Sequence, residues 1–164
     1  MERLLSFRTA VLAAVVALSA GCGDDDSTTV VRDTGSVSGT VTFIAGTWPA
    51  NGNIQISVFS EYPPTGAPDG FTTPLNPATD FPTHDYTLSG LEVGTYAAVV
   101  VGWRDPGNPQ GARTIGIYWA YVDSLGMEPG DPPVAKAPGP QSVTVEKDQV
   151  TAGVDIVADL TLVP

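Results

Sequence analysis

Residues that can act as nucleophiles, bases or zinc ligands are scarce in this chain. It has one cysteine, Cys22, and one histidine, His84. A catalytic serine or cysteine needs a histidine base that a third group orients, and the sequence around His84 indicates no such partnership. A zinc site needs several cysteine or histidine ligands. We therefore expect no catalytic residue, no metal and no cofactor. We interpret His84, which precedes a predicted strand, as an exposed loop residue.

Asp155 and Asp159 form a pair of carboxylates in a segment that alternates like a strand. Side chains four residues apart on a strand share one face but lie ~13 Å from each other. This separation is too large for the paired carboxylates of a glycosidase. We interpret both aspartates as part of a solvated outer face. A hydrolase would need two acids that converge in one cleft.

Oxygen-bearing side chains also gather in two predicted loops. They are Asp123, Glu128 and Asp131 in the loop 122–140, and Asp105 and Asn108 in another loop. Loops rich in oxygen ligands can hold Ca²⁺ in exported β domains. The spacing here matches no calcium motif such as the EF-hand loop. Calcium binding by a loop therefore stays open, and no metal ligand is predicted.

The aromatic residues are the best candidates for contact with a ligand. Trp48 follows the end of a predicted strand, and Tyr118 lies in an aromatic cluster near the end of another. Exposed rings at strand ends stack on sugar rings or hold the apolar side chains of a partner. The parity of Trp103, Trp119 and Tyr121 favours a place in the core instead. Trp48 and Tyr118 are therefore the predicted ligand-binding residues.

Residues 1–21 have the three parts of an export signal. Arg3 and Arg8 outweigh Glu2, an apolar run covers 10–18, and small residues follow. The apolar run is far shorter than the ~20 residues that span a bilayer, which argues against a permanent transmembrane helix. The segment is therefore expected to be removed after export.

The end of this leader, Ala20-Gly21-Cys22, resembles the signal peptide of bacterial lipoproteins. In that family the cysteine thiol takes a diacylglycerol, and the peptide is cut just before it. The family usually has leucine three places before the cysteine, where this chain has Ser19 after Leu18. The resemblance implies that Cys22 becomes the acylated first residue and anchors the chain to a membrane. A lone cysteine also fits lipidation better than a disulfide framework, which needs an even number.

Residues 22–35 are predicted to be a flexible tether, because the stretch after Cys22 is polar and acidic. Asp24, Asp25 and Asp26 resemble the acid-rich signals that send some lipoproteins to the cell surface. A plain soluble linker explains them equally well. The expected location is the cell envelope, on the outer membrane, with the periplasmic and the surface face both open.

The charge of the chain after the leader excludes some partners. Without residues 1–21 the chain has 5 Lys and Arg against 17 Asp and Glu, a net charge of −12. So acidic a surface repels nucleic acids and anionic headgroups. We therefore expect no DNA, RNA or direct phospholipid binding beyond the lipid on Cys22.

Residues 36–164 are predicted to form one all-β domain, a seven-stranded Greek-key-like β-sandwich. Apolar and polar residues alternate in short segments, Pro- and Gly-rich turns separate the segments, and none has a helical period. The predicted strands cover 37–43, 54–58, 86–88, 95–103, 115–121, 143–145 and 154–162.

Two stretches resemble carboxypeptidase regulatory-like domains, which are related to transthyretin. They are Gly-Ser-Val-Ser-Gly-Thr-Val-Thr at 35–42 and Tyr-Thr-Leu-Ser-Gly-Leu-Glu-Val-Gly-Thr-Tyr at 86–96. In the second stretch we expect Gly94 to take a positive φ and Tyr96 to bury its ring, with its hydroxyl on a turn carbonyl. The resemblance implies a rigid, adhesive or accessory domain without catalysis. The lysine–asparagine crosslink of some relatives needs an early lysine, and none precedes Lys136 in this chain.

These observations predict a membrane-anchored lipoprotein that acts as a non-catalytic structural or protein-interaction module. The alternative is a carbohydrate-binding surface lipoprotein that uses Trp48 or Tyr118. The two hypotheses predict an envelope protein or a glycan as the partner, respectively.

Overall fold

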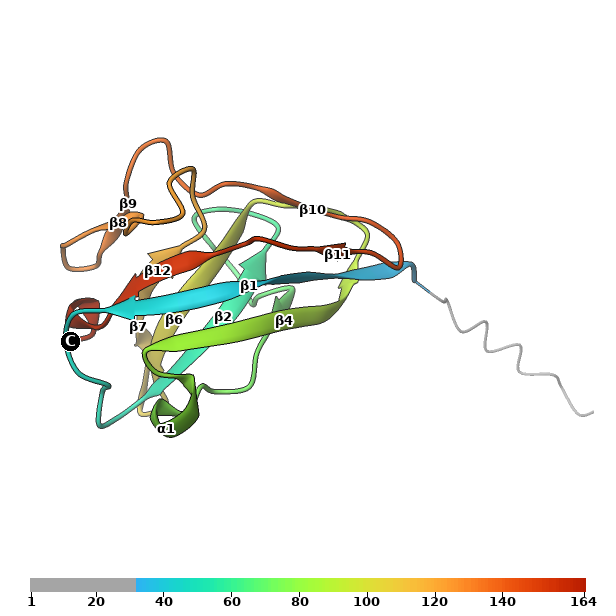
Figure 1. The fold of residues 1–164 in the computed structure, drawn as a ribbon. Coiled ribbons are helices and arrows are strands. Elements are labelled where there is room, and N and C mark those ends of the chain that lie inside the picture. The colour runs from blue at the N-terminus through green and yellow to red at the C-terminus, as the bar shows by residue number, and fades with distance from the viewer. Residues whose placement is uncertain (1–31) are drawn as a thin grey trace, which may run out of the picture. The chain divides into compact units, whose positions relative to one another are not determined.

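The computed structural model describes residues 32–164 (Figure 1). Cys22, the leader and residues 22–31 of the predicted tether lie outside the described residues. The first strand begins at Thr34, so the domain starts two residues earlier than predicted. Within residues 32–164, helices stay too short and too polar to cross a bilayer.

The described chain forms twelve strands, one α-helical turn and one 3-10 turn. They are β1 Thr34–Ile44, β2 Asn53–Phe59, β3 Gly70–Phe71, α1 Pro77–Asp80, β4 Thr83–Glu92, β5 Gly94–Tyr96, β6 Ala98–Asp105, β7 Asn108–Ile117, β8 Met127–Glu128, β9 Val134–Ala135, β10 Val143–Val145, β11 Val150–Thr151, β12 Ile156–Asp159 and η1 Leu160–Leu162. All seven predicted strands are present in whole or in part, and the prediction of an all-β domain is confirmed. The Greek-key connectivity stays a prediction.

Eight strands form one mixed sheet in which β1 pairs with three others (Figure 1). On one side β1 pairs antiparallel with β4; on the other it pairs parallel with β11 and then β12. From β12 the sheet continues through β7, β6 and β2 to β3. The last three pairings, β7–β6, β6–β2 and β2–β3, are all antiparallel.

The sheet curls so that its two halves enclose one core. Gly70 on β3 lies so close to β4 that a Cβ there would be 2.5 Å from the Leu91 side chain. Val37 of β1, Ile56 of β2 and Val101 of β6 point into the same buried cluster. Among the described side chains, the buried ones are apolar or are tyrosines and tryptophans, so apolar packing is the main force that holds the interior together.

Strands β7 and β12 end earlier than predicted. β7 stops at Ile117, and the chain turns away before Tyr121. β12 stops at Asp159, whose carboxylate accepts a hydrogen bond from the backbone N–H of Thr161 at 2.8 Å and caps the 3-10 turn. A side chain that satisfies the first free N–H groups favours a helical turn over continued extension. Val157, which has the same parity as Asp155 and Asp159, is nevertheless buried, so both faces of β12 carry buried side chains.

The turn around Tyr96 is partly as predicted. The Tyr96 ring is buried, and its hydroxyl donates to the carbonyl oxygen of Glu92 at 2.8 Å. The predicted positive φ at Gly94 is wrong, because Gly94 is extended in β5 and pairs with Val145. Gly90 takes the left-handed conformation instead, with φ of 74°.

Candidate functional site

Trp48 and Tyr118, the predicted ligand-binding residues, are both half-buried and lie in different surroundings. The Trp48 ring packs edge-on against Phe43 at 5.3 Å and against Phe81 at 6.5 Å between ring centroids. Tyr118 is held by its backbone, whose N–H donates to the carbonyl of Val99. Trp48 therefore covers one end of the core. Neither ring lines the two hollows described below.

The remaining aromatic predictions are confirmed for two residues and wrong for one. Trp103 and Trp119 are buried, and their indole N–H groups donate to the carbonyls of Asn51 and Ser124. Tyr121 is 63% exposed, against the prediction that it fills the core. The reason is the early end of β7, which removes Tyr121 from the alternation of that strand.

The carboxylates of Asp155 and Asp159 both accept hydrogen bonds from the backbone. Each residue is partly buried. The carboxylate of Asp155 accepts from the backbone N–H of Thr40 at 2.8 Å, and that of Asp159 caps η1. Both carboxylates therefore serve the fold locally.

Two carboxylates of the acidic loops bind structural partners. Asp131 accepts from Arg113 at 2.6 Å, and Asp105 closes the β6–β7 hairpin by accepting from the N–H of Gly107 at 2.8 Å. The predicted long loop also contains the short strands β8 and β9. Within residues 32–164, no three acidic, histidine or cysteine side chains converge as a metal site would require.

His84 lies within β4 and is partly buried, so the predicted exposed loop position is wrong. Its Nδ1 is 3.0 Å from an Asp80 carboxylate oxygen. Asn76 caps the short helix α1 and brings Asp80 to this position, and the N–H of Asn76 is the main cause that lowers the pKa of Asp80. The hydroxyl of Thr79 donates to Asp80 and not to the imidazole, so the three groups do not form a nucleophile–base–acid relay.

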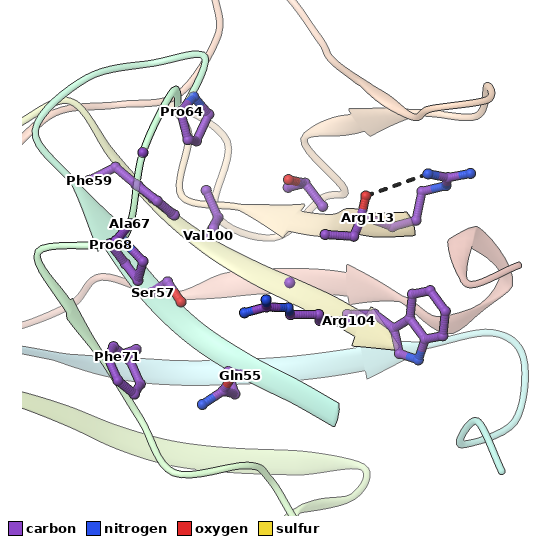
Figure 2. Close-up of a pocket in the computed structure, with 15 residues that line it drawn as sticks. Gln55, Ser57, Phe59, Pro64, Ala67, Pro68, Phe71, Val100, Arg104 and Arg113 are labelled. Carbon is purple, nitrogen blue, oxygen red and sulfur yellow. Dashed lines mark hydrogen bonds between the residues drawn. The ribbon is translucent and has the colours of Figure 1, made fainter. Parts of the chain in front are cut away.

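A hollow lies over the outer face of β2, β6 and β7 (Figure 2). Its volume is about 740 Å³. We call it the arginine groove, and its lining residues are Gln55, Ser57, Phe59, Pro64, Gly66, Ala67, Pro68, Phe71, Val100, Gly102, Trp103, Arg104, Ala112, Arg113 and Thr114. This volume is in the range of small-molecule and peptide side-chain pockets in proteins.

Strand alternation and one loop build the arginine groove. Ile54, Ile56 and Val58 of β2 face the core, which leaves the alternate residues of that strand on the outer face. The loop between β2 and β3, residues 60–69, supplies the proline-bearing wall seen beside Phe59 in Figure 2. Val100 forms part of the floor and is only 4% exposed.

The charges of the arginine groove are unlike those of the chain as a whole. No aspartate or glutamate is among the lining residues, but two arginines are. Arg113 is bound to Asp131, whereas Arg104 is exposed and forms no ion pair with any carboxylate in the described part of the chain. The Arg104 side chain extends from β6 over the sheet toward Ser57 (Figure 2).

A second hollow, of about 370 Å³, lies over the outer face of β1 and β12. We call it the acidic hollow, and it is lined by Thr40, Thr42, Ile44, Val122, Asp123, Ser124, Leu125, Asp155, Ile156 and Val157. Of its two carboxylates, that of Asp155 is used by the Thr40 backbone and that of Asp123 is exposed.

Comparison of this chain with protein-family models, with curated proteins and with solved structures finds no match. The structure therefore defines the chain only as an all-β domain with an open groove on its outer face. Sequence reasoning missed the groove, because its residues come from four strands and one loop. The signal that was available is the polar alternation at 55 and 57, together with prolines at 63, 64 and 68.

Proposed function

We propose that this chain is a non-catalytic interaction module, held at the bacterial cell envelope by a lipid on Cys22, that binds a partner protein in the arginine groove. The single observation that carries the proposal is the groove itself. It combines an aromatic and proline wall with a row of polar side chains on a rigid sheet. Sites of this kind bind by apolar contact and use a few polar groups for orientation.

The chemistry of the lining supports binding without catalysis. The hydroxyls of Ser57 and Thr114 are present, but the lining holds no histidine, cysteine or carboxylate to act as a base. The chain's one histidine belongs to a different cluster, with Asp80 and Thr79. An arginine stays protonated at all ordinary pH values and cannot take a proton from a nucleophile.

The lining also favours a protein over a neutral sugar. A sugar ring presents several hydroxyl donors, and its sites in proteins need acceptors for them. In the arginine groove no carboxylate is available, and the side-chain acceptors are limited to the amide oxygen of Gln55 and the hydroxyls of Ser57 and Thr114. Phe71, which is 62% exposed, offers an apolar anchor of the type that dominates protein interfaces.

The test is photo-crosslinking in cells that produce the full chain. A photoreactive amino acid replaces Phe71 in the groove or, as the matched control, Val134 on β9, which is 53% exposed and outside the lining. We expect a discrete covalent adduct with one protein from position 71 and none from position 134. Adducts of equal yield at both positions, or none at 71, would contradict a partner in the groove.

The lipid anchor is tested separately. Cys22→Ser removes the thiol that the acyl chains require, and we expect the protein to leave the membrane fraction. Mass spectrometry of the mature N-terminal peptide should find acyl chains on Cys22 in the unchanged protein. A free thiol at Cys22 in membrane-bound protein would overturn this part of the proposal. Protease shaving of intact cells separately distinguishes a surface location from a periplasmic one.

A further inference from the structure

We propose that the arginine groove binds an acidic peptide segment in which a carboxylate stands beside an aromatic or aliphatic side chain, and that Arg104 holds the carboxylate. The inference rests on the proposed function, because it names the chemistry of the partner segment at that same groove. Three features of the groove carry it: the local charge, the freedom of Arg104 and the position of the apolar wall.

The first feature is a basic site on an acidic molecule. From residue 22 onward the chain has 5 basic and 17 acidic residues, yet the groove lining has two of the basic residues and none of the acidic ones. The negative potential of the surrounding surface repels anions, whereas the positive groove attracts them. An anionic segment is therefore guided to the groove and away from other faces, which gives specificity more than affinity.

The second feature is that one arginine is available and the other is not. Arg113 donates to Asp131 at 2.6 Å, so its charge is already compensated. Arg104 lies where the β6–β7 register shifts, between Trp103 and Asp105, and has no carboxylate partner among residues 32–164. A guanidinium has five donors in a planar fork that matches a carboxylate. Arg104 is therefore the group that an incoming carboxylate meets.

The third feature is the apolar wall on the same groove. Phe59, Pro64, Pro68 and Phe71 lie together on the side of the β2–β3 loop, and Arg104 extends over the sheet toward them (Figure 2). An occupant that fills the groove contacts both parts at once. It must carry an apolar side chain and an anion close together, which a short acidic peptide segment does.

In the experiment, random heptapeptides displayed on phage are selected for binding to the full mature chain carrying Cys22→Ser. The peptide of the resulting consensus is synthesised and titrated by fluorescence anisotropy. We expect an Asp or Glu next to an aromatic or aliphatic residue. Arg104→Gln should weaken binding about tenfold, and amidation of the peptide carboxylate should do the same. The combined change should cost no more than either change alone. Arg32→Gln, which removes an arginine paired with Glu92 outside the groove, is the control and should leave the affinity unchanged.

Three results would overturn the inference. They are a consensus without an acidic residue, an affinity that Arg104→Gln does not alter, and failure to select any peptide. In the last case an acidic oligosaccharide, polygalacturonate fragments, is titrated in parallel, and binding that Arg104→Gln abolishes would assign the groove to a sugar acid. Peptides that lack an acid but are lost with Phe71→Ser would contradict this inference while supporting the proposed function.

Discussion

The arginine groove and the acidic hollow both lie on outer faces of the same sheet, and they differ in what their charged groups already contact. In the acidic hollow, Asp155 accepts from the backbone N–H of Thr40 and so holds the segment before β12 to β1. In the arginine groove, Arg104 contacts no carboxylate of the described chain. The difference teaches that an available charge, and not the mere presence of charges, distinguishes a binding surface from a structural one.

The largest effect on stability is expected where Gly39 of β1 lies against the backbone of Val154. A Cβ added at Gly39 on β1 would lie 2.1 Å from the carbonyl oxygen of Val154, which is backbone and cannot rotate away. We expect Gly39→Ala to lower the free energy of unfolding by about 3 kcal/mol, at the upper end of overpacking costs. Gly94→Ala is the matched control, because a Cβ there has no neighbour within 4 Å. Urea denaturation measures the free energy of unfolding of both variants. Equal losses would contradict the close contact between Gly39 and Val154.

The next largest effect on stability concerns the hydrogen bond that joins β4 to the backbone of Val154. The buried hydroxyl of Tyr86 donates to the carbonyl oxygen of Val154 at 2.6 Å. Tyr86→Phe leaves that carbonyl without the donor, and we expect a loss of about 1–2 kcal/mol. Tyr96→Phe removes a similar bond that is only partly buried and should cost less. If the Tyr96 variant is the less stable of the two, burial does not determine how much these hydrogen bonds contribute to stability.

Tyr86 also predicts how stability depends on pH. Burial raises the pKa of its phenol well above the ordinary value of 10.0, and the charges of Asp155 and Tyr118 add to the effect. The folded state then keeps the proton at pH values where the unfolded state releases it. The stabilisation is complete below about pH 10 and decreases as the pH rises further. Urea midpoints measured across this range should fall less steeply for Tyr86→Phe than for the unchanged chain.

The fold was largely predictable from the sequence because alternation reports which side chains face the core. The alternation at 54, 56 and 58 identifies β2, and it holds wherever the strand continues. It fails at Tyr121, which lies beyond the end of β7. Leu160 is buried as its parity predicts, although the chain leaves the extended form there for a capped 3-10 turn. Asp159 could have signalled this end, because aspartate readily caps a helical turn.

The candidate site was not predictable, because it depends on which segments meet. Phe71 and Val100 lie on either side of Ser57 only because β2 pairs with both β3 and β6. Likewise, the freedom of Arg104 is visible only when the position of every carboxylate is known. Trp48 and Tyr118 were chosen from residue type and from their places near predicted strand ends, and their rings pack against the core.

A smaller effect on stability tests the claim that Asp155 serves the fold. Asp155→Ala removes the acceptor of the Thr40 N–H, a partly buried bond, and should cost about 1 kcal/mol. Asp123→Ala is the control in the same hollow, because its side chain is exposed and its carboxylate has no hydrogen-bond partner among residues 32–164. A control that destabilises as much as Asp155→Ala would show that both acids are structural, and the contrast within the hollow would be lost.

The smallest effect on stability is expected in the arginine groove. Phe71 lies on the two-residue edge strand β3 and is 62% exposed, so Phe71→Ser should change the free energy of unfolding by less than about 0.5 kcal/mol. The same change removes the main exposed apolar anchor of the groove, and binding of the selected heptapeptide should fall about tenfold. Val134→Ser, at an exposed valine outside the groove, should alter neither quantity. A large loss of stability with Phe71→Ser would mean that the ring supports the fold, as the carboxylate of Asp155 does. Both hollows would then be structural surfaces that differ only in the sign of their charge.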